Sequence, residues 1–208
     1  MLATEYQHLV TGLNASHDYL VPTVLRQLET TGLLGVDRRL FEMGFGNGSV
    51  AFELSQHGWA VTGVEVSESG LQHARLRYPT LQLEEGSVYD DLANKYGRFP
   101  VVISLEVVEH LYSPRIFVQR MFDLLEPGGL AILSTPYHGY WKNLALAVTG
   151  KWDQHLTALW DHGHIKFWSP ATISTLLREA GFQPPTIERV GRIPIVAKSM
   201  VVLARRSA

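Results

Sequence analysis

An acidic residue and three alternate glycines form the stretch of this chain best suited to hold a small ligand. Glu42, Gly44, Gly46 and Gly48 stand at the end of a short apolar run that begins at Arg39. Glycine has no Cβ, so the backbone can turn tightly or lie flat against a ligand at these positions. The first amides of a helix that follows would point at the same ligand. The stretch therefore predicts a buried strand, a glycine turn and a helix start that together bind something small and polar.

A second acidic residue, Glu65, stands near the end of the next apolar run, which covers 60–66 and so includes Val66. In open parallel sheets, ligands bind outside the carboxyl ends of the strands. A carboxylate at such an end suits the two hydroxyls of a ribose, and we predict this contact for Glu65. The alternative is an exposed glutamate at the end of a strand.

Two carboxylates and an imidazole, those of Glu106, Glu109 and His110, directly follow the apolar run 99–105. If a helix begins near Glu106, the three side chains share one face, because residues three and four apart are helical neighbours. Such a group could bind a divalent cation such as Mg²⁺, although histidine suits Zn or Fe better. The alternative is that Glu109 caps its helix and His110 forms a local hydrogen bond.

Two further histidines are candidates for proton transfer. His138 follows the predicted strand 130–135, and His164 precedes the predicted helix that starts at Ser169. Imidazole titrates near neutral pH and is the side chain most often used in acid–base catalysis. A lone histidine is more often structural, and His162 with His164 could instead be a pair of metal ligands.

Apolar runs that alternate with amphipathic segments predict βαβ units and a parallel sheet. The last two predicted strands form an antiparallel pair at the sheet edge. The predicted strands cover 39–42, 60–66, 81–85, 99–105, 130–135, 186–191 and 200–205, and the predicted helices cover 16–33, 49–57, 70–78, 115–125 and 169–180.

We predict a single domain over 1–208, with an N-terminal helical segment over 1–37 and a cap insertion over 137–167. The cap is rich in Trp, Tyr and His, and long irregular insertions in compact domains usually serve as lids or binding loops. A small satellite core without a ligand is the alternative. The apolar stretch 144–148 within the cap could touch a membrane or a partner subunit.

Composition narrows the class of partner. The chain has 208 residues, a formal net charge of -2 and a pI of about 6.5, which argue against nucleic acid and favour a small-molecule substrate. It has no cysteine, and residues 1–10 do not resemble a signal peptide, so a cytoplasmic location is expected. No apolar stretch is long enough for stable membrane insertion. The oligomeric state stays open.

Several motifs in one order resemble the class I S-adenosylmethionine (SAM)-dependent methyltransferases, and within them the chain is similar to the ubiquinone-biosynthesis-type O-methyltransferases. The resemblance covers roughly 39–182 and is strong as a combination, whereas each motif alone is weak. Its carriers are 41–48, Glu65, 104–111, 124–129 with 134–136, and 164–169 with 179–182.

The resemblance implies a Rossmann-like, doubly wound α/β fold with a seven-stranded sheet whose last strand is antiparallel. It also implies that SAM lies across the ends of the first two strands. The implied contacts are the methionine part of SAM with Glu42 and Gly44, the ribose with Glu65, the adenine with Ser87 and Val88, and the sulfonium side with Leu105 and Glu106. Gly46, Gly48 and Val66 are further residues expected to bind the cofactor.

The chain departs from the family pattern at two positions. Many relatives carry Asp where Ser87 stands, so the adenine contact is open and Asp90 is a possible substitute. Many also carry Asp where Pro100 stands, but that position is mostly structural.

The function that the resemblance implies is SAM-dependent methyl transfer to a small molecule, with a phenolic or similar hydroxyl as the acceptor. Methyl transfer from a sulfonium is an in-line displacement, so the enzyme mainly orients the reactants and excludes water. A hydroxyl also needs a base, here Glu109, His110, His138 or His164, or a metal such as Mg²⁺ on Glu106, Glu109 and His110.

Two alternatives remain. A nicotinamide-dependent oxidoreductase is disfavoured by the glycine spacing and by the lack of a Tyr-x-x-x-Lys pair. A SAM-binding domain without catalysis is compatible with the departure at Ser87.

Overall fold

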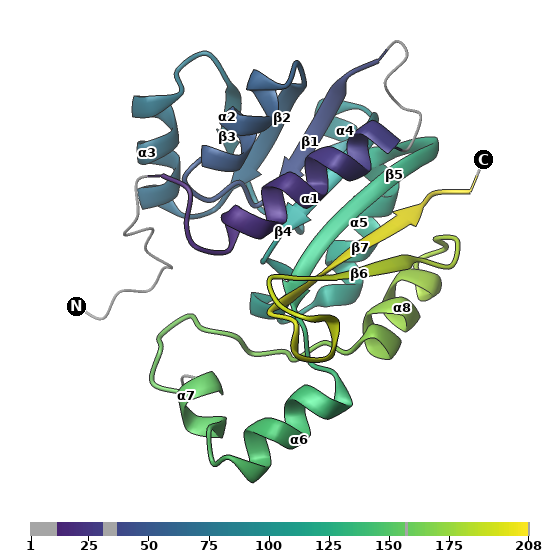
Figure 1. Cartoon of the computed structure of the whole chain (residues 1–208). Coiled ribbons are helices and arrows are strands. Elements are labelled where there is room, and N and C mark those ends of the chain that lie inside the picture. Colours follow the sequence, from purple (N-terminus) through teal and green to yellow (C-terminus); the bar gives the residue numbers. More distant parts are fainter. Residues whose placement is uncertain (1–11, 31–36, 157, 208) are drawn as a thin grey trace.

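The computed structural model describes residues 12–30, 37–156 and 158–207, which form one seven-stranded sheet with helices on both faces (Figure 1). The strand order is β3-β2-β1-β4-β5-β7-β6. The strands are β1 (Arg39–Met43), β2 (Ala60–Glu65), β3 (Gln82–Glu85), β4 (Phe99–Leu105), β5 (Leu125–Pro136), β6 (Thr186–Val190) and β7 (Ser199–Arg205).

The helices mostly connect these strands. They are α1 (His17–Thr30), α2 (Ser49–Gln56), α3 (Glu68–Arg77), α4 (Leu92–Tyr96), α5 (Pro114–Leu124), α6 (Tyr140–Val148), α7 (Trp152–Leu156) and α8 (Pro170–Glu179), with 3₁₀ turns η1 (Val108–His110) and η2 (Pro194–Val196).

The pairing of the strands confirms the predicted fold class. β1 pairs in parallel with β2 and β4, β3 pairs in parallel with β2, and β5 pairs in parallel with β4, whereas β7 runs antiparallel to both β5 and β6. The carboxyl ends of the first five strands therefore meet at one edge of the sheet, where ligands bind in folds of this kind.

Each face of the sheet has its own apolar core. One core joins side chains of α1, α2 and α3 to the sheet, and the other joins those of α4, α5 and α8. Figure 1 shows α1 crossing one face while α5 and α8 lie on the other. β4 is buried along its whole length, as its continuous apolar sequence predicts for a central parallel strand.

Helix α4 and strand β5 differ from the sequence prediction. Helix α4 was not predicted; it is a single short turn in which the side chain of Asp91 caps the backbone amide of Asn94. Strand β5 begins at Leu125 rather than Leu130, because Leu125 pairs with Phe99 and Leu130 with Val101, so residues 126–129 bulge out of the ladder. The C-terminal end of the predicted first helix, 31–33, lies outside the described residues.

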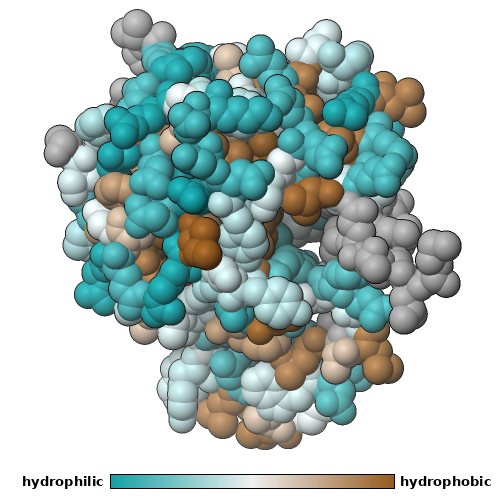
Figure 2. Space-filling view, turned by 180° about the vertical axis from the view of Figure 1, so that it is seen from behind, coloured by the Kyte–Doolittle hydropathy of each residue, from teal (hydrophilic) through white to brown (hydrophobic). Residues whose placement is uncertain are grey.

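The cap is more regular than predicted. The sequence suggested an irregular lid, but α6 and α7 are helices, and they lie apart from the sheet in the lower part of Figure 1. Neither helix has a buried residue. Figure 2 shows hydrophobic residues on this lobe and a hollow between it and the body of the molecule. The large exposed apolar residues of α6 are Tyr140, Trp141, Leu144 and Val148.

No helix among the described residues combines the length and the apolar character that crossing a membrane requires.

Candidate functional site

The glycine turn after β1 is held by backbone hydrogen bonds. The amides of Gly44 and Phe45 both donate to the carbonyl of Val64 in β2, at 2.9 and 3.3 Å. Gly48 stands before α2 with φ of 78°, and a Cβ there would lie 2.9 Å from the Cβ of Ala74 in α3. The third glycine of the motif therefore lets α3 pack against the turn.

Glu65 fastens the turn to the end of β2. Its buried carboxylate accepts hydrogen bonds from the backbone amides of Gly46 (2.7 Å), Val66 (2.9 Å) and Ser67 (2.9 Å). Oε1 accepts two of these bonds and Oε2 accepts one, so Oε2 retains acceptor capacity for a ligand hydroxyl. The residue predicted to bind a ribose is thus also a structural part of the glycine turn.

Glu42 is a buried carboxyl with an unsatisfied oxygen. It is 2% exposed, and its Oε2 has no hydrogen-bond partner among the described residues. Burial, together with the negative charge of Glu65, raises the pKa of Glu42 to about 8. A buried unpaired polar atom is rare and costly, and a ligand ammonium would satisfy it. This fits the amino group of the methionine part of SAM.

The turn after β3 contains the predicted adenine-binding residues. Val88 is buried, and the Ser87 amide donates to Oδ2 of Asp90 at 2.8 Å. The Ser87 hydroxyl accepts from the Tyr89 amide at 3.1 Å. Asp90 thus lies beside Ser87, and its Oδ1 does not take part in this hydrogen bond. This position agrees with the prediction that Asp90 could replace the Asp that many relatives carry where Ser87 stands.

No helix begins at Glu106, so the condition under which Glu106, Glu109 and His110 would share a helical face is not met. Glu106 has a left-handed backbone with φ of 55°, and the short η1 turn starts only at Val108. The carboxylate of Glu106 therefore lies against the neighbouring strands, where it accepts from the hydroxyls of Ser134 (2.8 Å) and Ser199 (3.4 Å). Burial raises the pKa of Glu106 to about 7, against the opposing effects of these two hydroxyls and the charge of Lys142.

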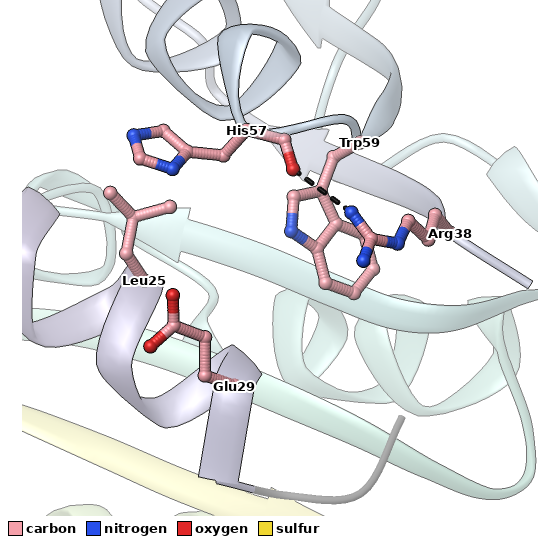
Figure 3. Close-up of a pocket in the computed structure, with 5 residues that line it drawn as sticks. All are labelled: Leu25, Glu29, Arg38, His57 and Trp59. Carbon is pink, nitrogen blue, oxygen red and sulfur yellow. Dashed lines mark hydrogen bonds between the residues drawn. The ribbon is translucent and has the colours of Figure 1, made fainter. Parts of the chain in front are cut away.

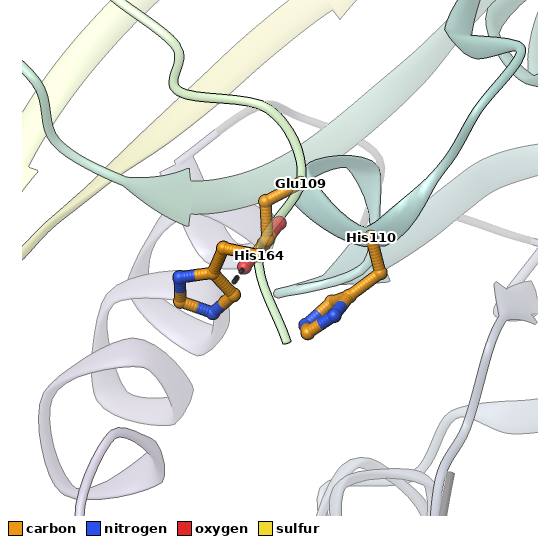
Figure 4. A group of neighbouring side chains, drawn as sticks. All are labelled: Glu109, His110 and His164. Atoms are coloured by element: carbon orange, nitrogen blue, oxygen red, sulfur yellow. Dashed lines mark ion pairs between the residues drawn. The ribbon is translucent and has the colours of Figure 1, made fainter. Parts of the chain in front are cut away.

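Three other side chains converge on one point (Figure 4). The potential ligand atoms of Glu109, His110 and His164 all lie within 4.8 Å of one another, and His164 comes from the far end of the cap. Both carboxylate oxygens of Glu109 are buried without a hydrogen-bond partner among the described residues. His110 directs Nδ1 at the carbonyl oxygen of His162, at 2.9 Å.

Burial shifts the pKa values of two members of this group. Burial, and then the negative charge of Glu106, raise the pKa of Glu109 well above its ordinary value. Burial, and then the neighbouring histidines, lower the pKa of His164 to about 4. His164 Nε2 lies 4.0 Å from Glu109 Oε1. A metal ion could take the place of the carboxyl proton.

Sequence reasoning did not bring His164 into the metal group, and it included Glu106, which does not belong to this group of ligand atoms. No local spacing links His164 to Glu109. The backbone supplies the link, because the amides of Ile165 and Lys166 both donate to the carbonyl of Glu109, at 2.9 and 3.0 Å.

His138 lies at the end of β5 in a mostly buried position. Its amide donates to the carbonyl of Trp168 at 3.1 Å, and its ring lies 5.3 Å from that of His155 and 5.1 Å from that of Phe167. Burial, and then the charges of Lys142 and His155, lower the pKa of His138 to about 4. An imidazole with this pKa is a weak base at neutral pH.

Two surface cavities lie at the opposite edge of the sheet. One cavity, of about 350 Å³, is lined by residues that precede β1 and β2 and by the facing side of α1. Arg38 there donates to the carbonyl of His57 at 3.1 Å (Figure 3). A second, of about 490 Å³, is lined mainly by the first residues of the same strands and by those of β3. Neither cavity includes a residue of the glycine turn or of the histidine group.

Comparison with known proteins gives one consistent family. A family model described as a methyltransferase domain matches residues 15–186. A ubiquinone biosynthesis O-methyltransferase from Ruegeria pomeroyi is 31% identical over 187 residues, covering 84% of this chain and 72% of that protein. The protein of the same name from Cereibacter sphaeroides is also 31% identical, covering 74% of this chain but 63% of that protein.

Solved structures share the fold. The magnesium protoporphyrin IX methyltransferase from Synechocystis, solved with bound S-adenosylhomocysteine (SAH), superposes with a TM-score of 0.67 at 20% identity, over 90% of this chain and 82% of that chain.

Proposed function

The chain belongs to the SAM-dependent methyltransferases, and from this membership we propose that it methylates a hydroxyl of a small, phenol-like acceptor. The relatives named above are O-methyltransferases by name, which supports oxygen as the methylated atom. They are longer than this chain, which spans 72% and 63% of their lengths.

The unsatisfied Oε2 of Glu42, beside the glycine turn, is the observation that carries the SAM-binding part of the proposal. In our proposal the carboxylate of Glu42 binds the ammonium of SAM, and Glu65 binds the ribose hydroxyls. Ser87 and Val88, with Asp90 beside them, contact the adenine, and Leu105 and Glu106 line the sulfonium side.

We propose that the acceptor lies between the ends of β4 and β5 and the cap. Trp160 meets the edges of His110 and His164, with centroid distances of 5.9 and 5.4 Å. The end of the cap also lies against η1, because the amides of Ile165 and Lys166 donate to the Glu109 carbonyl, and Trp168, just after the cap, donates from Nε1 to the carbonyl of Val108 at 3.4 Å. Aromatic side chains of this kind suit a flat acceptor, and their cover limits the access of water to the sulfonium.

We further propose that Glu109, His110 and His164 hold a divalent metal. The Nδ1 of His110 faces the backbone carbonyl of His162, an arrangement typical of histidines that bind a metal through Nε2. One carboxylate and two imidazoles suit Zn, Fe or Mn better than Mg²⁺. Such an ion would lower the pKa of a bound hydroxyl.

Proton transfer then falls to the remaining buried groups. The lowered pKa values of His138 and His164 suit neutral ligands or hydrogen-bond acceptors more than bases. The carboxyl of Glu106 has a pKa of about 7, so it can accept the acceptor proton near neutral pH. Experiment can distinguish a catalytic methyltransferase from a SAM-binding domain without catalysis. The first methylates an acceptor, whereas the second only binds SAM.

The proposal is tested by calorimetric titration with SAH, with NADH as the control, in wild-type protein and in Glu42→Gln. We expect one-to-one binding of SAH alone, weakened in the variant. Methyl transfer from SAM to catechol, before and after removal of metal with a chelator, then tests the reaction. Binding of NADH in place of SAH, or SAH binding without turnover of any phenol or catechol, would contradict the proposal.

The domain division and the cytoplasmic location stay predictions. We retain one domain with an N-terminal helical segment over 1–37 and a cap over 137–167.

A further inference from the structure

Glu106 adopts a backbone conformation that residues with a Cβ rarely take. Its φ of 55° lies in the left-handed region, and within the part of the chain that the structure describes His162 is the one other non-glycine residue with a positive φ. Such a conformation persists only where the surrounding structure fixes the residue, and it is common at functional sites. The contacts that fix Glu106 therefore bear on its role.

The hydroxyl of Ser134 contacts Glu106 at two points. It accepts from the Glu106 amide at 3.0 Å and donates to the carboxylate oxygen Oε1 at 2.8 Å. A hydroxyl has one hydrogen and two lone pairs, so it can form both bonds at once. Ser134 lies in β5 and is fully buried, so water does not compete for its hydroxyl. Ser134 thus fixes the backbone and the carboxylate of Glu106 relative to each other.

A second hydroxyl faces the other carboxylate oxygen. Ser199 of β7 is 2% exposed, and its Oγ lies 3.4 Å from Oε2 of Glu106, a longer and weaker contact. An ionised carboxylate only accepts, so the single hydroxyl hydrogen of Ser199 points to Glu106. The hydroxyl of Tyr19, which lies 3.2 Å from Ser199 Oγ, is then the donor in that pair. Tyr19 of α1 thereby orients Ser199 towards Glu106.

The connection between β6 and β7 holds Tyr19 in turn. A Cβ at Gly191 would lie 3.2 Å from Cε1 of Tyr19, so the ring packs closely on this turn. The ammonium of Lys198 lies 5.4 Å from the centre of the same ring. Burial raises the pKa of Tyr19 above its ordinary value, so the hydroxyl keeps its proton at neutral pH and can donate it to Ser199.

We propose that Ser134 and Ser199 are positioning residues that orient the carboxylate of Glu106 towards the acceptor hydroxyl, and that Tyr19 orients Ser199. This inference rests on the proposed function, in which Glu106 accepts the acceptor proton. In that step the O–H bond of the acceptor breaks and its proton passes to Glu106. The oxygen bonds the methyl carbon, and the electrons of the broken C–S bond stay on sulfur. A carboxylate fixed at both oxygens needs no reorientation when the acceptor binds.

The test compares catechol with 4-nitrocatechol as acceptors in the full chain with saturating SAM. The nitro group makes the hydroxyl more acidic, so its methylation depends less on a base. Ser134→Ala should lower kcat for catechol about tenfold or more beyond its effect on 4-nitrocatechol, and leave KM for SAM unchanged. Equal losses for the two acceptors would overturn the inference, while methylation of both by wild type leaves the proposed function intact.

Two further variants follow the order of the contacts. Ser199→Ala should show the same selective loss to a smaller degree, because its contact with Glu106 is longer. Tyr19→Phe keeps the ring and its packing, so it tests the hydroxyl alone, and its selective loss should be the smallest of the three. A selective loss in Tyr19→Phe that exceeds the one in Ser199→Ala would contradict a role exerted through Ser199.

Ser104→Ala is the matched control. Ser104 is a buried serine at the same end of the neighbouring strand β4, but its hydroxyl donates to the carbonyl of Met43 at 2.7 Å. Any loss in this variant should be equal for catechol and 4-nitrocatechol. A selective loss as large as that of Ser134→Ala would show that the removal of any buried hydroxyl here has this effect, and would overturn the inference.

A spectroscopic measurement keeps the inference testable if no acceptor is methylated. In infrared spectra of the protein, the carboxylate band of Glu106 is the band that Glu106→Gln lacks. It should shift in Ser134→Ala and, by less, in Ser199→Ala, because each variant removes one hydrogen bond to the carboxylate, and it should stay in place in Ser104→Ala. A band at the wild-type frequency in both Ser134→Ala and Ser199→Ala would overturn the inference.

Discussion

At the ends of β1 and β2 the site consists of backbone amides and two buried carboxyls, those of Glu42 and Glu65, whereas at the ends of β4 and β5 it consists of titratable side chains from distant segments. Glu65 binds three amides within two short loops. The group of Glu109, His110 and His164 instead joins η1 to the far end of the cap. The first side can recognise a constant ligand by its backbone, and the second can change its chemistry through a few side chains.

The largest expected effect tests the backbone side. Glu65→Ala removes the acceptor of the three amides and of the proposed ribose hydroxyls, and charge-assisted hydrogen bonds contribute about 1.5–3 kcal/mol each. We expect SAH affinity to fall by about 100-fold or more in calorimetry. Glu85→Ala is the matched control, because Glu85 is an exposed glutamate at the end of the adjacent strand. Equal affinities in both variants would remove Glu65 from the cofactor site.

The next effect tests the side-chain side. His164→Ala should lower kcat by about 10- to 100-fold, the usual loss around a metal site, and leave SAH affinity unchanged. Metal content, measured by elemental analysis, should fall in parallel. His162→Asn serves as the control, because His162 has φ of 60°, which Asn tolerates, and its contribution to the metal group is a backbone carbonyl. A full metal content in His164→Ala would contradict the proposed ligand set.

The buried acid next to the glycine turn, Glu42, has a raised pKa, as the buried acids at the ends of β4 and β5 also have. Because the pKa of Glu42 is about 8 in the folded protein, the native state binds its proton more tightly than the unfolded state does. Stability without SAM is therefore complete below the ordinary pKa and is lost as the pH rises through about 8.

Urea unfolding of SAH-free protein measures this effect. From about pH 6 to about pH 8.5, wild type should lose roughly 2 kcal/mol relative to Glu42→Gln, which has no proton to lose. Glu85→Gln should follow the wild-type curve. Parallel curves for wild type and Glu42→Gln would show that the burial of this carboxyl carries no cost.

A glycine pair separates close packing from backbone conformation. Gly48→Ala should destabilise the protein by about 1 kcal/mol more than Gly97→Ala. Both residues have φ of 78°, but a Cβ at Gly48 would lie 2.9 Å from Ala74 Cβ, whereas nothing lies within 4 Å at Gly97. Thermal unfolding of the two variants measures the difference. Equal losses would assign the whole requirement at Gly48 to its backbone angle.

The smallest effect belongs to the cap. Val148→Ser should change the free energy of unfolding by less than about 0.5 kcal/mol, because Val148 is 79% exposed and α6 has no buried residue. The matched substitution Val118→Ser, in buried α5, should be strongly destabilising. A comparable loss for Val148 would show that the cap is covered in solution.

The contrast between the two sides also explains what the sequence could predict. β1, the glycine turn and Glu65 follow from local patterns, since each depends on neighbours within a few residues. The helix start considered at Glu106 does not form. Glu106 has a left-handed backbone, and its carboxylate accepts from the hydroxyls of Ser134 in β5 and Ser199 in β7. α6 has no buried residue and was predicted only as part of an irregular cap. His164 lies near Glu109 only because the chain returns to η1 after the cap, and no local spacing in the sequence indicates this contact.

The fastening of the cap has a consequence for how proteins of this kind could diverge. His138 donates its amide to the Trp168 carbonyl, and Ile165 donates to that of Glu109, so the entry and the exit of the cap are tied at neighbouring points. A segment tied in this way can be exchanged for one of another length or sequence while the sheet keeps its register. If the cap binds the acceptor as proposed, evolution could change acceptor specificity by replacing the cap while the SAM-binding site stays the same.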